Sequence, residues 1–251
     1  MKRMLGMLIG LAFTAGAFAW AMAWPARDHS YRYRLTVEVM TPQGLRRGAA
    51  VREFTWRRLP KITAEARSAR TAQRGEAVSV QLPGGRNLYL LLDDEPAATP
   101  LMAFYNAGEG SGQDRIKAAA RAGGVFTMPH LSRFGRGRLR HLPTFVTFRE
   151  NLTPESIEWV DPRDLSATLG SGYALSKITA EVVDEPITRQ VERQLPWLAT
   201  IARERASILP DVPILLREQS ASQRIRPGAF STELRRPTRG SVPAALRGKP
   251  D

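Results

Sequence analysis

The sequence predicts an α+β fold: a largely antiparallel β-sheet built from hairpins, with short helices in the C-terminal half. In the first half of the chain, segments that alternate between apolar and polar residues come in pairs joined by turn residues. Helical patterns are short and lie later in the chain, without the regular strand–helix alternation of a parallel sheet. Residues 31–210 are expected to form one α+β domain.

The first predicted hairpin lies near the start of this domain. Residues 31–39 alternate aromatic or β-branched residues with polar ones, as a half-buried strand does. Residues 41–44, Thr-Pro-Gln-Gly, are a turn signal, and residues 49–56 are expected to form the returning strand. The basic stretch that follows, residues 57–74, has weak periodicity and is predicted to be a surface connection.

A second hairpin is predicted from residues 76–82, the turn at residues 83–85 and the strand at residues 87–92. The run from Leu88 to Leu92 is apolar at every position. A strand without a polar face is typical of the middle of a sheet that is covered on both sides. We therefore expect residues 88–92 to be buried on both faces.

The remaining elements are shorter. Helices are expected at residues 113–122, 188–195 and 199–209, with a further two-turn helix that begins at Asp161 and is closed by Gly170. Strands are expected at residues 143–148 and 178–183. From about Arg217 to the end, residues 217–251, Arg, Pro, Gly and Ser dominate and apolar periodicity fades. This basic tail is predicted to be disordered and to bury little apolar surface.

The N-terminal residues predict where in the cell the protein is located. A basic start, residues 1–4, precedes twenty residues from Leu5 to Trp24 that hold no charge. Twenty helical residues span about 30 Å, the thickness of a bilayer's hydrocarbon core. Small residues before Trp20 and Trp24 also fit signal-peptide cleavage sites, but the length favours an uncleaved membrane anchor. We expect a single-pass inner-membrane protein with its bulk in the periplasm, or a periplasmic protein if the segment is cleaved.

The amino-acid composition limits the classes of binding partner and of site that the chain is expected to have. The net charge is +13, from 37 Lys and Arg against 24 Asp and Glu, and such a surface attracts polyanions. Arginine greatly outnumbers lysine, which is also typical of a GC-rich genome. For an exported chain, anionic lipid or envelope polymer is the expected polyanion, and nucleic acid is not. The chain has no cysteine, which excludes disulfides, thiolate metal sites and a cysteine nucleophile.

Several separated blocks look familiar. They are Arg74-Gly75-Glu76-Ala77-Val78, Leu142-Pro143-Thr144-Phe145-Val146-Thr147-Phe148, Asp161-Pro162-Arg163-Asp164-Leu165, Asp184-Glu185-Pro186-Ile187-Thr188 and Leu195-Pro196-Trp197-Leu198. In this order they resemble a family of uncharacterised proteobacterial proteins, each with a single N-terminal membrane segment. The resemblance covers residues 31–198 and implies an envelope location, with no activity to carry over.

The strongest candidate site is an arginine-rich loop, residues 129–141. It contains four arginines with Phe134 and two glycines between them: Arg133, Arg136, Arg138 and Arg140. Guanidinium groups bind phosphates and carboxylates through paired hydrogen bonds, and glycine allows close approach. The loop is therefore a candidate anion-binding site, and a solvated basic loop is the alternative.

Other polar groups suggest weaker sites. His130 and His141 bracket the same four arginines, which are poor neighbours for a metal dication. Residues 181–192 hold the acids Glu181, Asp184, Glu185 and Glu192, which favour either acid–base chemistry or pairing with basic groups of the same protein. The glycine-rich residues 108–112 lack the ending of a phosphate-binding loop. No catalytic residue, metal or cofactor is predicted. The expected function is binding or scaffolding in the cell envelope, with a hydrolase-like envelope enzyme as the alternative.

Overall fold

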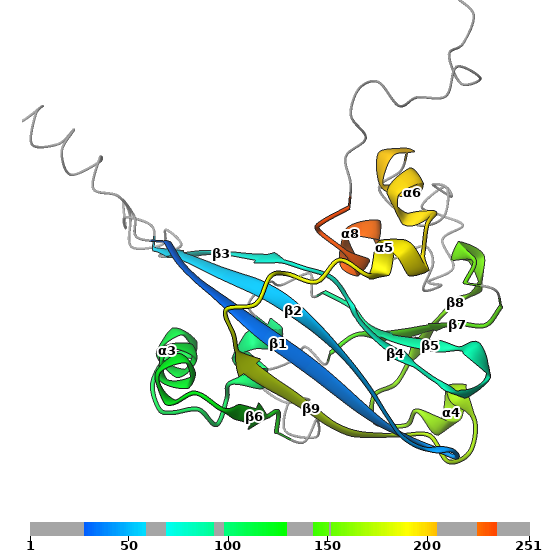
Figure 1. Ribbon diagram of the computed structural model, residues 1–251, viewed down its shortest axis with the longest axis horizontal. Helices are drawn as coiled ribbons and strands as arrows, with labels where there is room; N and C mark the ends of the chain where they lie inside the picture. The colour runs from blue at the N-terminus through cyan, green and yellow to red at the C-terminus, as the bar shows by residue number, and fades with distance from the viewer. Residues whose placement is uncertain are drawn as a thin grey trace, which may run out of the picture. The chain divides into compact units, whose positions relative to one another are not determined.

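The computed structural model describes residues 28–58, 69–92, 98–129, 143–150, 152–204 and 225–234, and it has an α+β fold with mostly antiparallel sheets (Figure 1). This confirms the predicted α+β class with mostly antiparallel pairing, although the strands form two sheets and the short helices α2 (Ala98–Ala103) and α3 (Gly112–Ala122) lie in the first half of the chain. The predicted membrane segment, residues 5–24, lies outside the described residues. Among the helices that the structure does describe, none is both long and apolar enough to cross a membrane.

The chain divides into two compact units. One, Ser30–Thr55 with Thr71–Asp251, holds the sheet cores and all the sites discussed below. The other, Met1–His29 with Trp56–Arg70, contributes only strand ends to the described residues.

A five-stranded sheet has the strand order β3-β2-β1-β9-β6. Its strands are β1 (Asp28–Thr41), β2 (Gly44–Arg58), β3 (Ala69–Arg74), β6 (Val125–Thr127) and β9 (Ala174–Val182). Only Pro42 and Gln43 join the neighbouring strands β1 and β2, so the first predicted hairpin is confirmed. β9 pairs antiparallel with both β1 and β6.

The strand β3 contradicts the prediction of a surface connection. It lies in the stretch that was expected to be a surface connection, residues 57–74. Its sequence, Ala-Arg-Thr-Ala-Gln-Arg, has no run of alternating large apolar residues. It forms a strand at the edge of the sheet, where backbone pairing with β2 substitutes for a buried face.

A four-stranded antiparallel sheet has the order β4-β5-β7-β8. Its strands are β4 (Val78–Gln81), β5 (Asn87–Leu90), β7 (Phe145–Phe148) and β8 (Ile157–Val160). The 3-10 turn η1 (Pro83–Gly85) closes the second predicted hairpin. All five residues from Leu88 to Leu92 are buried, as predicted for a strand covered on both faces.

Arg52 of β2 links the two sheets. Its side chain is 0% exposed. Its Nε donates to the carbonyl of Glu76 at 2.9 Å, and its Nη2 donates to the carbonyl of Leu90 on β5 at 2.8 Å. Backbone oxygens thus accept the hydrogen bonds of Nε and Nη2, whereas Nη1 is buried without a partner among the described residues.

The helices are short. They are α2 (Ala98–Ala103), α3 (Gly112–Ala122), α4 (Ser166–Leu169), α5 (Val191–Gln194), α6 (Leu198–Glu204) and α8 (Pro227–Phe230), with a 3-10 turn η3 (Pro154–Ser156). α3 confirms the helix expected at residues 113–122. α4 is a single turn rather than two, because residues 161–164 form a turn before it, although Gly170 does cap its end as predicted. α5, α6 and α8 lie together beside the four-stranded sheet (Figure 1) and share a core with it.

The predicted disordered tail also needs correction. Residues 225–234 lie within it, yet they include α8 and bury Ile225 and Phe230 in the core of α5, α6 and the four-stranded sheet. The prediction is wrong for these ten residues, because two isolated apolar side chains carry no periodic signal. Residues 217–224 and 235–251 lie outside the described part of the chain.

Candidate ligand-binding pocket

The described residues form a pocket of about 500 Å³ between β6, β9 and the residues around α4. Its floor is apolar and includes the buried side chains of Met128, Leu165 and Ile178. Polar groups surround this floor, among them the exposed side chains of Arg163 and Lys177. The volume lies in the range of pockets that bind small molecules, which are also mostly apolar with a few polar groups.

The α4 side of the pocket is fixed by local hydrogen bonds. Asp161 Oδ1 accepts from the backbone N–H of Arg163 at 2.9 Å and so forms the turn that presents Arg163. Asp164 Oδ1 accepts from the hydroxyl of Ser166 at 2.5 Å and from the backbone N–H of Ala167 at 3.2 Å. These bonds, chiefly that from Ser166, hold the pKa of Asp164 below its ordinary value. The carboxylate of Asp164 is therefore already hydrogen-bonded to residues at the start of α4.

The described residues give the pocket a positive charge. Among them, two bases and one acid line it, namely Arg163, Lys177 and Asp164. Lys177 also lies 3.6 Å from a carboxylate oxygen of Glu38 on β1, a pair that is weak because the lysine is half-exposed. An anionic group entering the pocket would therefore meet two cations, while the local carboxylate already accepts hydrogen bonds.

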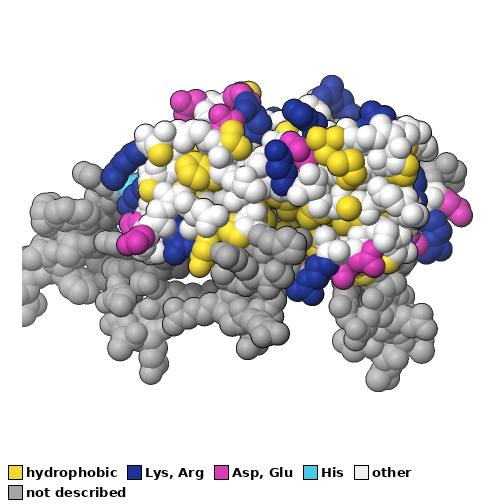
Figure 2. Space-filling view, turned by 90° about the horizontal axis from the view of Figure 1, so that it is seen from below, with side chains coloured by type: hydrophobic (Ala, Val, Ile, Leu, Met, Phe, Trp, Pro, Cys, Tyr) yellow, Lys and Arg dark blue, Asp and Glu magenta, His cyan; other side chains and the backbone are white. Residues whose placement is uncertain are grey.

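The face shown in Figure 2 mixes charges of both signs. On the face shown in Figure 2, Lys and Arg side chains are scattered among Asp and Glu side chains and patches of hydrophobic ones. This mixing indicates that the net charge is distributed over that face rather than concentrated in one basic surface. A specific anion site must then come from local shape as well as charge.

The predicted anion-binding loop lies outside the described residues. This holds for Arg133, Arg136, Arg138 and Arg140, and also for His130 and His141. Pro129, the first residue of that loop, does line the pocket. The loop therefore leaves the described structure at the pocket edge, and its role stays a prediction.

The acidic stretch pairs with the protein's own arginines. Arg34 Nη1 lies 2.7 Å from Glu181 Oε2, and Arg34 Nη2 bonds to the carboxylate of Glu185. The carbonyl of Asp184 accepts from Arg32 at 3.4 Å. Neither Glu181, Asp184 nor Glu192 lines the pocket. This confirms the simpler of the two sequence interpretations for Glu181 and Glu185, which form an ion-pair network on the sheet.

The glycine-rich residues 108–112 have a structural role. Ser111 and Asp114 form a capping box at the start of α3, which occupies the N–H groups that a phosphate would need. A Cβ on Gly112 would lie 1.8 Å from Leu101, so this glycine serves packing against α2. Within the described ranges, no group of three or more His, Asp or Glu side chains could hold a metal ion.

The chain matches no known family model, no curated protein and no solved structure. Functional inference therefore rests on the geometry above. Sequence reasoning missed the pocket because its walls, β6 and β9, are about fifty residues apart in the chain and become neighbours only through sheet pairing. The turn at residues 161–164 was recognised, but only as the start of a helix.

Proposed function

We propose that this protein is a membrane-held domain of the cell envelope that works by binding an anionic amphipathic ligand in the pocket between α4, β6 and β9. The observation that supports this most directly is the combination of an apolar floor with Arg163 and Lys177 at one cavity. An apolar chain would bury its surface against Met128, Leu165 and Ile178, and a phosphate or carboxylate would pair with the cations.

The arginine-rich loop extends this proposal. Arg133 follows Pro129 by four residues, and four extended residues span at most about 14 Å. Arg133 is thus within chain reach of the pocket edge, where it would add to the attraction for an anion. The membrane location completes the proposal, because residues 5–24 would hold the pocket near anionic lipid and envelope polymer.

The test uses the full chain in nanodiscs of zwitterionic lipid, titrated calorimetrically with decyl phosphate and, as the uncharged probe, decanol. Replacing both Arg163 and Lys177 by alanine is expected to weaken decyl phosphate binding about 2- to 30-fold, as for two exposed charge pairs. Decanol binding should not change. Arg149→Ala is the matched control for Arg163→Ala alone, because Arg149 is an exposed arginine that pairs with Glu158 outside the pocket.

Two results would refute the proposal. One is equal binding of decyl phosphate by the wild type and the double variant. The other is an equal loss in Arg163→Ala and Arg149→Ala, which would show that only the overall charge of the protein matters.

A further inference from the structure

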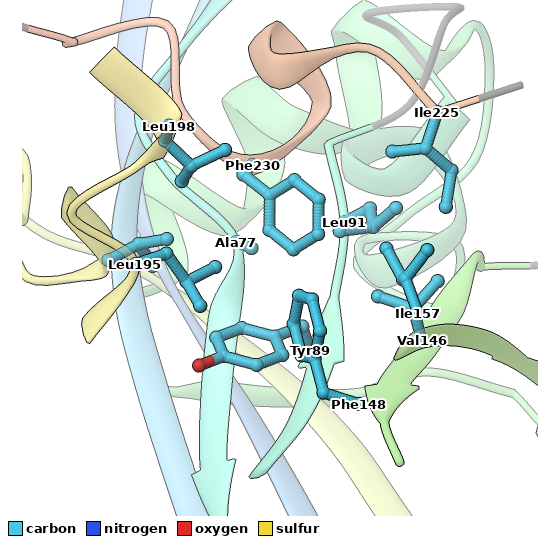
Figure 3. Close-up of a cluster of buried hydrophobic side chains, with 11 residues drawn as sticks. Ala77, Tyr89, Leu91, Val146, Phe148, Ile157, Leu195, Leu198, Ile225 and Phe230 are labelled. Atoms are coloured by element: carbon cyan, nitrogen blue, oxygen red, sulfur yellow. The ribbon is translucent and has the colours of Figure 1, made fainter. Parts of the chain in front are cut away.

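The turn between β1 and β2, with the residues beside it, exposes apolar side chains to solvent. Most large apolar side chains of the described residues are buried against one another, as in the cluster of Figure 3. Five are exposed, and two of these flank this turn, since Met40 is 46% exposed and Leu45 is 44% exposed. Pro42 lies exposed between them. Exposed apolar side chains that are gathered in one place mark a contact surface, whereas single scattered ones do not. We call residues 40–47 the hairpin tip.

The hairpin tip is also positively charged. Arg46 and Arg47 follow Leu45 directly, and both are exposed. Arg46 donates to the side-chain oxygen of Gln43 at 3.5 Å, which keeps its guanidinium at the turn. The sequence contains no acidic residue from 39 to 52, and none from 169 to 176, where the chain turns into β9 beside the tip. The tip thus combines apolar side chains with cations that no acid in these two stretches neutralises.

Local contacts fix the shape of the hairpin tip. The hydroxyl of Thr41 donates to the carbonyl of Gly44 at 2.7 Å and accepts from the backbone N–H of Gln43 at 3.2 Å. Gly44 has a φ of 98°, a conformation that glycine adopts without strain. A Cβ added to Gly172 would lie 3.0 Å from Cγ of Pro42, so these two residues are closely packed. The exposed side chains are therefore held by a rigid turn before any partner binds, which lowers the entropy cost of binding.

The hairpin tip adjoins the pocket of the proposed function. In the register of β1 and β9, Val39 pairs with Leu175 and Met40 pairs with Ala174. Both Leu175 and Ala174 line the pocket. Because directly paired residues point to the same face of a sheet, Met40 lies next to the pocket wall that Ala174 forms. Figure 1 shows the turn between β1 and β2 beside the start of β9 and close to α4.

We propose that the hairpin tip docks on an anionic lipid bilayer, with Met40 and Leu45 among the lipid headgroups and Arg46 and Arg47 paired with lipid phosphates. Apolar side chains gain free energy by leaving water at this interface, and basic residues gain it from the negative surface potential. A stable protein interface buries about 1,000 Å² or more with close complementarity of shape. A single turn presents less surface than this, whereas a bilayer adapts its shape to a small apolar tip.

Docking of the tip would bring the pocket wall beside Met40 to the membrane surface. An anionic amphipathic ligand would then pass between bilayer and pocket without crossing bulk water. This consequence depends on the proposed function of the pocket, whereas docking of the tip does not.

The test attaches an environment-sensitive dye to the hairpin tip of the full chain. Because the chain has no cysteine, Gln43→Cys provides a single attachment point for nitrobenzoxadiazole. The labelled chain is assembled with nanodiscs of phosphatidylcholine, either alone or mixed with phosphatidylglycerol. The dye reports on the tip whether the chain is held through residues 5–24 or binds from solution. In anionic nanodiscs its emission should shift to shorter wavelength, and lipid that carries a nitroxide on its acyl chain should quench it.

The control label is attached through Ala122→Cys. Ala122 is exposed at the end of α3, and the nearby Val125 pairs with Glu181, at the other end of β9 from Ala174. A dye at this position should show neither the shift nor the quenching. The rate at which dithionite reduces each dye gives the ratio of docked to undocked label.

The contribution of charge is tested with two pairs of arginines. Arg46→Ala with Arg47→Ala should lower the ratio of docked to undocked tip about 30-fold in anionic nanodiscs, because each basic residue near such a surface contributes roughly fivefold. Arg121→Ala with Arg149→Ala is the matched control, since it removes the same number of exposed arginines away from the tip. This control should change the ratio by no more than about twofold, because salt screens distant charges.

The contribution of the apolar side chains is tested with Met40→Ser and Leu45→Ser in one chain. Both residues are exposed, so the fold should be retained, and the net charge is unchanged. The ratio of docked to undocked tip should fall at least about tenfold, because the apolar area that docking removes from water is lost.

Three results would overturn the proposal. If dithionite reduces the tip label in anionic nanodiscs as fast as the label at position 122, the tip stays in water, and a protein partner becomes the alternative. Equal losses in the two arginine pairs would show that only the overall charge attracts the chain to the membrane. Unchanged docking of the serine variant would show adsorption by charge without apolar contact. Decyl phosphate binding measures the pocket separately, so its persistence after any of these results would leave the proposed function standing.

Discussion

Replacing Phe230 by alanine should destabilise the domain strongly, although the residue lies in a stretch rich in Arg, Pro and Gly. The ring is fully buried and contacts three other aromatic rings. Substitutions of a buried phenylalanine by alanine cost about 3–5 kcal/mol, because the lost transfer free energy adds to the cost of the cavity. Domains of this kind have a total stability of about 5–15 kcal/mol, so the variant would lose a large share of it.

The assay is thermal unfolding of the full chain in detergent, followed by circular dichroism. For a domain of about 150–250 residues, 1 kcal/mol corresponds to roughly 2–4 °C, so the melting temperature should fall by about 6–20 °C. Tyr105→Ala is the matched control, since Tyr105 is an aromatic residue that is 37% exposed, and its loss should cost far less. Truncation after Leu234 should leave the transition unchanged, whereas truncation after Arg217 should abolish or lower it. Equal melting temperatures for Phe230→Ala and Tyr105→Ala would refute the reasoning.

Three further predictions follow from the charges and the termini. The pKa of Glu233 is lowered in the folded state, so its ion pairs with Arg74 and Arg189 stabilise the protein at pH values above the ordinary pKa of 4.5. This stabilisation is lost as the pH falls through the lowered pKa. Glu233→Gln should therefore flatten the acid side of a plot of melting temperature against pH. Replacing the four arginines of the arginine-rich loop by alanine should weaken co-sedimentation with anionic vesicles at low salt. In about 0.5 M salt the wild type and the variant should sediment equally, because the charges are screened. Unchanged sedimentation at low salt would show that the loop is ordinary solvated surface. If residues 5–24 span the membrane, the protein should resist high-salt extraction, and a phosphatase fused after Leu198 should be active; an inactive fusion would contradict the topology.

The features that could be predicted from the sequence are those that local residues determine. The run from Leu88 to Leu92 is apolar at every position, and only a strand covered on both sides can bury it. The α3 helix likewise carries its own start signal, because Ser111 and Asp114 bond each other's backbone N–H groups across one turn. In both cases the decisive contacts lie within a few residues of each other.

What escaped prediction depends on contacts between distant segments. Phe230 is the only aromatic residue of the segment 225–234, and its burial is decided by rings from β5, from β7 and from Trp197, just before α6. β3 is a strand only because β2 offers it an unpaired edge. The pocket exists because β6 pairs with β9, and its polar rim joins residues from that strand and from the turn before α4. No local pattern distinguishes such residues from exposed ones.

Several acidic side chains of the described residues are paired within the fold. Glu181 and Glu185 are paired with Arg34, Glu158 with Arg149, and Glu233 with Arg74 and Arg189. Glu76, which is buried, accepts from two backbone N–H groups at the start of α5. These acids are committed to contacts within the fold and are poorly placed to neutralise further cations. The chain as a whole has a net charge of +13, and a net charge of this sign attracts anions diffusely, an effect that salt screens. Selectivity for one anion must come from a place where charge meets an apolar cavity, and the pocket at Arg163 and Lys177 combines the two.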